Sequence, residues 1–526
     1  MGGGQLLGSG GAHQRPQGGN PPVLAAAAAG LHAGGGVLSG DPGPGQERAP
    51  VYEAMLEYQR RGVVPLHTPG HKGVAGPPGL ERWLTPLGLA CDLPSMDATD
   101  YWFHPQGCIA RAQELAARLY GAAETFYLVN GSTIGVQAML LAALAPGEQV
   151  LLPRYLHLSA FSGLVLSGAV PVYLHTRWLE PAGPVPPTAE EVEAQLRLHP
   201  EVRAVFLTHP TYYGVGRPLA PVAEVCRRHD VALLVDEAHG AHLRFLPGSP
   251  LPSALESGAD VVVQSVHKTV GSLVGTAQMH RGRGGRVTAE RLQAALNLLQ
   301  STSSSYLLLA SLDLARRWMW AEGEARFGRA AGAAAALAGA LDAAGGAVAL
   351  RASRHPELAG CAQDPLRMVV DVAGLGMSGF EVERRLLQEF GLLDEFCDAR
   401  NVALVLGPQD APETYERLAA AFRSLAASRP TAALPPDDRL RTAPAPPLVL
   451  TPREAAYRPR APVPLTEALG RVCGEMITMY PPGIPLVCPG EEVTAEVVDH
   501  CRALAAQRAC VFAEDPALAT VTVLTD

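Results

Sequence analysis

The sequence predicts an α/β fold, with a mainly parallel β-sheet covered by helices on both faces and smaller α+β units after it. Between about Thr125 and Gln278, short apolar runs rich in β-branched residues alternate with helical stretches, and Gly-rich turns separate them. Buried strands that alternate with helices are typical of parallel sheets. With 526 residues, 48% of them hydrophobic, the chain is long enough for two or three domains with a real core.

The alternation can be followed along the chain. The run TFYLV precedes the helical stretch IGVQAMLLAALA, and QVLL precedes SAFSGLVLSG. VPVYL, AVFLT, VALLV and ADVVVQ supply further strands, with a helical VAEVCRRH before VALLV. Beyond the sheet, the Ala/Leu-rich stretches Arg283–Leu312 and Trp318–Ala344 are expected to be helical.

The composition predicts four segments. Residues 1–50 are low-complexity Gly, Ala and Pro, and we expect a disordered tail or a targeting segment there. The range 51–430 forms the major domain, which opens with an amphipathic helix (VYEAMLEYQRRG) and ends in a small α+β part. Proline is dense over 431–462, which indicates a linker, and 463–526 forms a C-terminal domain.

Charge and cysteine usage argue against several classes of protein. The net charge is -9 and no basic stripe appears, which argues against binding nucleic acid or an anionic membrane. The 9 cysteines include no CxxC pair, so we expect neither a metal site nor a disulfide framework. We expect a cytoplasmic protein with reduced thiols. Import into a plastid or mitochondrion is the alternative, because the first 40 residues contain no Asp or Glu.

Two charged residues follow neighbouring buried strands. Lys268, in SVHKT, follows ADVVVQ, and Asp236, in VDEAHGAH, follows VALLV. Burial and the neighbouring His267 would lower the pKa of Lys268 and make its amine a nucleophile. A buried Asp236 could keep the ring nitrogen of a pyridine cofactor protonated. The plain alternatives are a lysine in a surface turn and an Asp that only ends a strand, with His239 as an ordinary polar residue.

A third motif, VNGSTIG, places Gly131, Ser132 and Thr133 between a strand and a helix. Backbone N–H groups at the start of a helix bind phosphate, although Ser and Thr also serve as plain helix caps. His157, in PRYLHLSAFSG, could stack on a flat cofactor or be a satisfied core histidine. The order of the four motifs is similar to that in the large domain of fold-type I (aspartate aminotransferase-like) pyridoxal-phosphate (PLP) enzymes.

Within that class the chain resembles the bacterial-type Orn/Lys/Arg decarboxylase family, in a short form without the N-terminal wing domain. The resemblance runs from about Val51 to the C-terminus. It is carried by PLHTPGHKG (Pro65–Gly73), AQELAARLYGAAETFYLVNGST (Ala112–Thr133), LVLSGAVPVY (Leu164–Tyr173), THPTYYGV (Thr208–Val215), VDEAHGAH (Val235–His242), GADVVVQSVHKTVGSL (Gly258–Leu273), LLQSTSSSYLLLASLD (Leu298–Asp313) and MITMYPPGIPLVCPGE (Met476–Glu491). The resemblance implies a seven-stranded sheet, PLP as cofactor, and a homodimer or higher even oligomer.

The resemblance also implies a role for each site residue. Lys268 holds the cofactor as a Schiff base, Asp236 pairs with the pyridine nitrogen, and His157 stacks on the ring. His239 lies near the ring hydroxyl or beneath the cofactor. The phosphate is surrounded by Gly131, Ser132, Thr133, Ser265 and His267. The pair Ser301–Thr302 reaches the phosphate of the partner subunit.

The implied reaction is loss of the α-carboxylate from lysine, ornithine or arginine, which gives cadaverine, putrescine or agmatine. Lys268 or a neighbouring histidine returns a proton to Cα. The candidate carboxylates for the far end of the substrate are Asp97, Asp100 and Glu395. One alternative is an aminotransferase that grips the α-carboxylate with Arg400. Another is a catalytically silent, regulatory relative of the decarboxylases.

Three departures from the family pattern put substrate choice, more than activity, in question. The segment MDATDYWFHPQGCIARAQ contains an unusual aromatic pair, Tyr101–Trp102, that could reshape the substrate entrance. Leu158 follows the stacking histidine, where the family commonly has Lys or Gln, and Ser304 replaces a usual proline. None of these changes removes a catalytic group.

Overall fold

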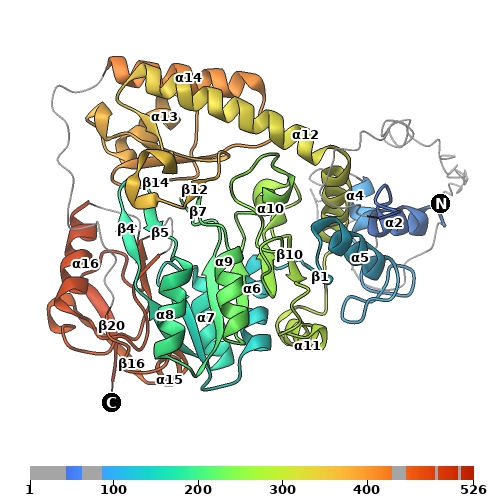
Figure 1. The fold of residues 1–526 in the computed structure, drawn as a ribbon, viewed down its shortest axis with the longest axis horizontal. Helices are drawn as coiled ribbons and strands as arrows, with labels where there is room; N and C mark the ends of the chain where they lie inside the picture. Colours follow the sequence, from blue (N-terminus) through green and yellow to red (C-terminus); the bar gives the residue numbers. More distant parts are fainter. Residues whose placement is uncertain (1–42, 62–85, 429–445, 480–483, 508–510, 526) are drawn as a thin grey trace, which may run out of the picture.

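The computed structural model describes residues 43–61, 86–428, 446–479, 484–507 and 511–525. The stretch PLHTPGHKG and most of the low-complexity segment over 1–50 lie outside the described residues. In Figure 1 an α/β domain occupies the centre, a smaller α+β unit lies above it, and a C-terminal unit lies at the lower left.

A seven-stranded sheet forms the centre of the α/β domain, in the order β1-β10-β9-β8-β6-β2-β3. The strands are β1 (Glu124–Leu128), β2 (Gln149–Pro153), β3 (Val170–Leu174), β6 (Val202–Thr208), β8 (Ala232–Asp236), β9 (Val261–Gln264) and β10 (Ala277–Arg281). β10 is antiparallel to both of its neighbours, and the strands from β9 to β3 are parallel. The predicted mainly parallel, seven-stranded sheet is therefore confirmed.

Helices cover both faces of this sheet, which explains why its strands are nearly continuous apolar runs. One face carries α6 (Gly131–Ala143), α7 (Leu158–Ser167) and α11 (Ala289–Leu299), and the other α8 (Ala189–Leu198) and α9 (Ala220–Arg228). Phe206 and Leu234 pack in the first core, whereas their chain neighbours Val205 and Leu233 pack in the second. Successive residues of one strand thus enter opposite cores.

The α+β unit is joined to the rest by the 39-residue helix α12 (Tyr306–Ala344), which runs from the N-terminal helices to this unit (Figure 1). The N-terminal helices are α2 (Pro50–Arg60), α4 (Pro86–Cys91) and α5 (Cys108–Tyr120). The unit consists of an antiparallel sheet, in the order β11 (Val348–Ala349), β13 (Arg367–Asp371), β15 (Asn401–Val405) and β14 (Phe396–Cys397), with α13 (Gly379–Phe390) and α14 (Pro412–Ala427).

The stretch Arg283–Leu312, expected to be helical, is interrupted. α11 ends at Leu299 and α12 begins at Tyr306. The intervening residues are mostly serine and threonine, whose side chains compete with a helix for backbone hydrogen bonds. Ser303, for example, donates its N–H to Ser301 Oγ at 3.1 Å.

The C-terminal unit has its own apolar core. It contains α15 (Pro452–Tyr457), β16 (Arg460–Pro464), β17 (Ile477–Met479), β18 (Ile484–Val487), α16 (Ala495–Gln507), β19 (Val511–Phe512) and β20 (Thr520–Leu524). β16 pairs with β20, so α15 and the first residues of β16 give regular structure to part of the range expected to be a linker. The division into domains otherwise stays a prediction.

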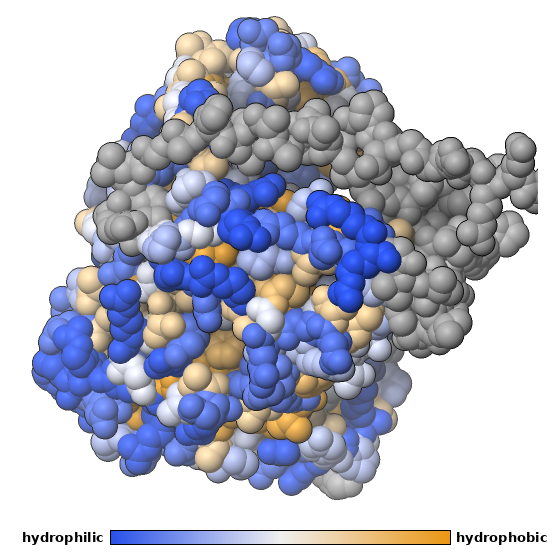
Figure 2. Space-filling view, turned by 90° about the vertical axis from the view of Figure 1, so that its right-hand side faces the viewer, coloured by the Kyte–Doolittle hydropathy of each residue, from blue (hydrophilic) through white to orange (hydrophobic). Residues whose placement is uncertain are grey.

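One face of the molecule is mainly hydrophilic (Figure 2). In the view of Figure 2 hydrophilic residues dominate, and hydrophobic ones occur in small groups. Within the described ranges, none of the helices combines the length and the apolar character needed to cross a membrane.

Candidate active site

Several of the predicted site residues converge at the carboxyl ends of the parallel strands. A cavity of about 180 Å³ lies there, and its wall includes five of the residues predicted to hold the cofactor: Ser132, His157, Asp236, His239 and Lys268. They come from four strand connections, because Ser132 opens α6 after β1 and His157 precedes α7 after β2. Asp236 ends β8, and Lys268 lies in the short helix α10 (Val266–Thr269) after β9. The remaining wall is formed by Tyr155, Leu156, Pro184, Thr208, Tyr212, Ala238 and Glu395.

A second cavity, of about 350 Å³, adjoins the first. Both are lined by His239, Lys268 and Glu395. The second is completed by His242, His267, Thr269, Phe327, Asp364, Leu366, Arg367, Val405 and Leu406. The Lys268 side chain therefore borders two hollows, one toward the main sheet and one toward the α+β unit.

The Lys268 amine is held by a histidine. Its Nζ lies 2.9 Å from His239 Nε2. Burial lowers the pKa of Lys268, Arg367 lowers it further, and Asp236 opposes both effects. Burial and the nearby lysine charge hold the pKa of His239 well below its usual value. The neutral imidazole can therefore accept a hydrogen bond from the lysine amine, and the lowered pKa of Lys268 favours the neutral amine that acts as a nucleophile.

Asp236 is only 5% exposed, although it lines the cavity. Its Oδ1 accepts the N–H of Ala238 at 3.0 Å, and its backbone carbonyl accepts the N–H of His209 at 2.9 Å. The carboxylate is thus fixed in orientation at the edge of the sheet. Such a group suits a charge-assisted hydrogen bond to a protonated ring nitrogen.

The predicted phosphate turn is only partly at the cavity. Ser265 Oγ donates to Ser132 Oγ at 2.9 Å, which links the turns after β9 and β1. Gly131 has φ +75°, a conformation that suits glycine, and donates its N–H to Gly275 O at 2.7 Å. Ser132 lines the first cavity, whereas Gly131, Thr133 and Ser265 line neither of the two.

His267 lies on the other side of Lys268, in the wall of the second cavity. Its Nδ1 lies 2.6 Å from the carbonyl oxygen of Thr276. Because a carbonyl only accepts, Nδ1 carries the proton and Nε2 is left as the acceptor. Burial lowers the pKa of His267.

His157 is exposed into the hollow, unlike a satisfied core histidine. It caps α7, where its Nδ1 accepts the N–H of Ser159 at 3.2 Å. Desolvation by the surrounding protein lowers its pKa, and the Lys268 charge adds to this. A neutral, oriented ring on the cavity wall is suited to stacking on a flat ligand.

Of the three candidate carboxylates, only Glu395 borders the cavities. Asp100 instead accepts backbone N–H groups at the start of α5, including those of Gly107 at 2.8 Å and Ile109 at 3.0 Å. Asp97 lines neither hollow, and nor do Tyr101 and Trp102 in this chain. The Asp100 carboxylate is therefore engaged in capping a helix, and Glu395 is the candidate that the cavities favour.

Two residues that the sequence did not single out, Arg367 and Tyr212, hold Glu395. Arg367, at the start of β13, donates Nη1–H to Glu395 Oε1 at 3.3 Å and Nε–H to the carbonyl of Tyr212 at 2.9 Å. Its guanidinium lies 4.5 Å from the Tyr212 ring centroid, and the Tyr212 hydroxyl donates to Glu395 Oε1 at 3.3 Å. Two sequence signals could have identified them. Arg367 is a charged residue at the start of the apolar strand in LRMVV, and Tyr212 belongs to the aromatic pair in THPTYYGV.

Arg400, the predicted carboxylate anchor of an aminotransferase, faces away from the site. Its guanidinium pairs with Asp371 at 2.7 Å and with Glu180 at 3.3 Å. It lines neither cavity. The aminotransferase alternative therefore lacks the anchor on which it was based.

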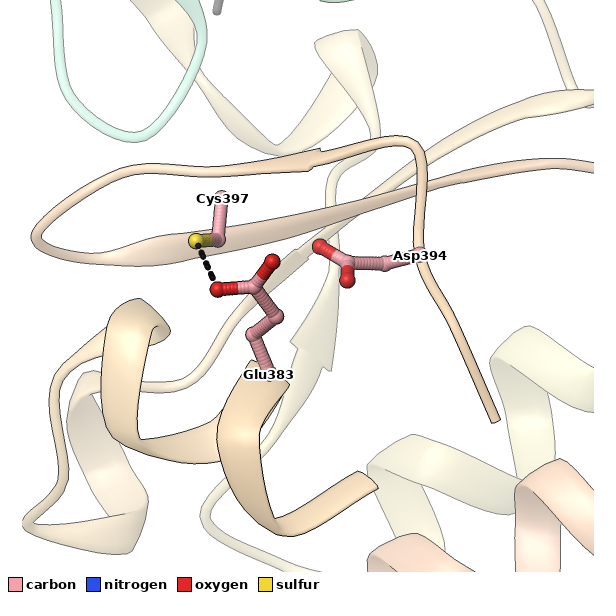
Figure 3. Close-up of side chains that lie close together, drawn as sticks. All are labelled: Glu383, Asp394 and Cys397. Atoms are coloured by element: carbon pink, nitrogen blue, oxygen red, sulfur yellow. Dashed lines mark hydrogen bonds between the residues drawn. The ribbon is translucent and has the colours of Figure 1, made fainter. Parts of the chain in front are cut away.

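One cluster of possible metal ligands includes residues on either side of Glu395 in the sequence. Figure 3 shows Glu383, Asp394 and Cys397 pointing toward one another, with their ligand atoms within 4.8 Å. The Cys397 thiol donates to Glu383 Oε2 at 3.1 Å, and burial raises the pKa values of Cys397 and Asp394, the latter to about 6. Both Asp394 carboxylate oxygens are buried without a hydrogen-bond partner among the described residues. We assign the cluster no ion, and the expectation of no metal site stays a prediction.

Two family models match the chain. They are Orn/Lys/Arg decarboxylase, major domain, over residues 49–337, and Orn/Lys/Arg decarboxylase, C-terminal domain, over residues 441–510. An arginine decarboxylase of Bacillus subtilis is 34% identical over 465 residues, which cover 86% of this chain and 93% of that protein. An inducible ornithine decarboxylase of Escherichia coli is 27% identical over 309 residues, which cover 51% of this chain and 41% of that protein.

Solved structures share the fold. Lysine decarboxylase A from Pseudomonas aeruginosa superposes with a TM-score of 0.78 at 20% identity, over 90% of this chain and 80% of that one. The constitutive lysine decarboxylase of E. coli gives a TM-score of 0.77 at 18% identity, over 91% of this chain and 82% of that one. At these identities the likeness establishes the fold alone.

Proposed function

The chain belongs to the Orn/Lys/Arg decarboxylase family, and from this premise we propose that it removes the α-carboxylate of arginine and releases agmatine. The family makes the protein a decarboxylase of basic amino acids. The choice of arginine is supported by the relatives named arginine decarboxylase, which match most of the chain, among them one from Halalkalibacterium halodurans at 33% identity over 87% of this chain and 93% of its own length. The observation that carries it is the Glu395 carboxylate, which faces the same hollows as the Lys268 amine.

We further propose PLP as the cofactor, because the residues present fit it. Lys268 would hold its aldehyde carbon, Asp236 its ring nitrogen, and His157 one ring face. Ser132, with Ser265 and the start of α6, would hold its phosphate. Two buried hydroxyls on the cavity wall, those of Tyr155 and Thr208, have no hydrogen-bond partner among the described residues, as expected where a polar ligand binds.

When bound, PLP accepts the electron pair that remains at Cα as CO2 leaves. The protein's task is to position the groups and to move protons. Lys268 Nζ borders the hollow in which Cα would lie, and His239 Nε2 at 2.9 Å can orient Nζ by a hydrogen bond. Lys268 can then return a proton to Cα, which completes the replacement of the carboxylate by hydrogen.

Glu395 would read the far end of the substrate. Its carboxylate accepts one hydrogen bond, at 3.3 Å, from the Arg367 guanidinium, which supports the proposal that a guanidinium can bind there. A planar guanidinium suits a carboxylate through paired N–H donors, whereas an ammonium offers a single point of charge. The substrate would share or replace Arg367 at Glu395.

Assembly and location are also proposals. We propose a homodimer or higher even oligomer, in which the exposed Ser301 and Thr302 reach the phosphate of the partner subunit. We propose a cytoplasmic protein; import into an organelle is the alternative, and it depends on the low-complexity N-terminal segment outside the described residues.

The test is an end-point assay of the purified chain with added PLP. Arginine, lysine and ornithine are supplied separately, and the product is identified by mass. We expect agmatine from arginine, and no product from the variant Lys268→Ala, because that variant lacks the amine. A product that depends on an added ketoacid would instead support transamination, and bound PLP without any amine product would support a regulatory protein.

A further inference from the structure

Arg154 links the catalytic domain to the C-terminal unit through a buried ion pair. It follows β2 and is 5% exposed, and its Nη1 contacts Oε1 of Glu491, which is 0% exposed. Its Nη2 donates to the carbonyl of Leu486 at 3.2 Å. The guanidinium also lies over the Tyr173 ring of β3, 5.2 Å from its centroid. A charge this deeply buried depends on its partners.

The glutamate side of the pair is held firmly within its own unit. Glu491 Oε2 accepts the N–H of Cys488 at 2.7 Å, and its backbone carbonyl accepts the N–H of Cys473 at 2.7 Å. The preceding Gly490 has φ +92°, and a Cβ there would come 2.4 Å from Leu450 O, so only glycine fits. The carboxylate is therefore a fixed point to which Arg154 is attached.

Arg154 is directly followed by the wall of the first cavity. Tyr155, Leu156 and His157 all line it, and Leu156 donates its N–H to the carbonyl of Arg154 at 2.9 Å. The same segment is contacted again after α7, where the Arg453 side chain of α15 lies against Gly168. The C-terminal unit therefore contacts the chain just before the wall residues, at Arg154, and again just after α7, at Gly168.

We propose that Glu491 is a positioning residue of the active site, which acts through Arg154 to hold the cavity wall formed by Tyr155, Leu156 and His157. The proposal rests on the proposed function, since it concerns the same cavity and its cofactor. The C-terminal unit would then contribute to the active site, because its Glu491 carboxylate fixes the position of His157.

The variant Glu491→Gln tests this. Glutamine keeps the shape of glutamate but removes the negative charge opposite Arg154. Its NH2 group must then face one of two other donors, either the Arg154 guanidinium or the Cys488 N–H. We expect the dissociation constant of PLP for the apoenzyme to rise roughly tenfold, as small displacements of positioning groups commonly do. Amide hydrogen exchange over residues 155–168 should become faster, while exchange in β8 and β9 should not change.

Glu475→Gln is the matched control. Glu475 is a glutamate of the same unit, 3% exposed, that accepts the N–H groups of Thr522 and Glu514, both within that unit. If Glu491 acts through Arg154, Glu475→Gln should leave PLP affinity within about twofold of the original. The proposal is overturned if both variants weaken PLP equally, or if Glu491→Gln changes neither readout.

A second variant covers the case in which Glu491→Gln does not fold. Arg154→Lys keeps the buried cation and loses the planar fork, so we expect the same changes at smaller size. Unchanged affinity and unchanged exchange over residues 155–168 would overturn the proposal. Neither the titration of PLP nor hydrogen exchange requires turnover. If the protein produced no amine, the proposed function would be contradicted, but both measurements could still be made and would still test the role of Glu491.

Discussion

The charges around the Lys268 amine largely decide how that amine behaves. Burial and Arg367 disfavour its protonated form, whereas Asp236 and Glu395 favour it. His239, which is neutral because of burial and the lysine charge, offers Nε2 as a hydrogen-bond acceptor 2.9 Å away. The neutral fraction of the amine therefore grows as the pH rises through a folded-state pKa below the ordinary value of 10.5.

This arrangement predicts the pH dependence of cofactor capture by the apoenzyme. The rate should rise with pH and level off above the pKa of Lys268. Because Arg367 lowers that pKa, Arg367→Met should move the inflection to higher pH; because Glu395 raises it, Glu395→Gln should move it to lower pH. Rapid-mixing absorbance at a series of pH values measures both. Shifts in the same direction for the two variants would contradict this account.

Glu395 should govern the affinity for substrate more than the rate of the chemical step. Loss of a charged hydrogen bond costs about 1.5–3 kcal/mol, so Glu395→Gln should raise KM for arginine by about 10–100-fold. Glu383→Gln is the control, because Glu383 lies outside both cavities. Steady-state kinetics with arginine decide the matter, and equal KM values for both variants would remove Glu395 from the substrate site.

At the scale of single elements, α5 shows how a distant residue completes a helix. Its N-cap is Gly107, which has no side chain to satisfy the first N–H groups. Asp100 supplies the acceptor instead, with Oδ2 on Gly107 and Ile109 and Oδ1 on Tyr101 and Gln106. One buried carboxylate thus holds both the loop and the helix that follows it.

Asp100→Ala should lower the free energy of unfolding by about 2 kcal/mol, at the upper end for a lost helix cap, because several backbone donors lose their acceptor. Asp100→Asn keeps one oxygen and should lose about half as much. Chemical denaturation followed by circular dichroism measures both. KM for arginine should not change, and a higher KM with unchanged stability would return Asp100 to the substrate candidates.

The position of a residue relative to the strands decided whether the sequence alone could identify it as a site residue. Lys268 and Asp236 were recognisable because each follows a buried apolar strand, and parallel strands bring their carboxyl ends together. Arg367 was not, because the backbone carbonyl it binds, that of Tyr212, lies 155 residues away in the chain. The serine-rich break before α12 was missed because its composition was averaged with the helices on either side.

At the scale of the whole molecule, the exposed Ser301 and Thr302 bear on how complete sites are formed. If they serve the partner's site, a Lys268→Ala chain mixed with a Ser301→Ala/Thr302→Val chain should form mixed dimers with one intact site each. Random pairing then gives about a quarter of the original activity from two inactive proteins. Activity after co-refolding measures this, and no gain on mixing would place each site within one chain.

The division of labour between the two sheets has a consequence for how substrate range can change. Asp236 ends a strand of the seven-stranded sheet and Lys268 follows another, whereas Arg367 opens a strand of the four-stranded sheet and Glu395 directly precedes another. Mutations that change the preference for the substrate side chain can therefore occur in a segment that contains none of the proposed proton-transfer groups. Laboratory evolution restricted to residues 365–406 should reach new side-chain preferences while the chemistry at Lys268 is inherited unchanged.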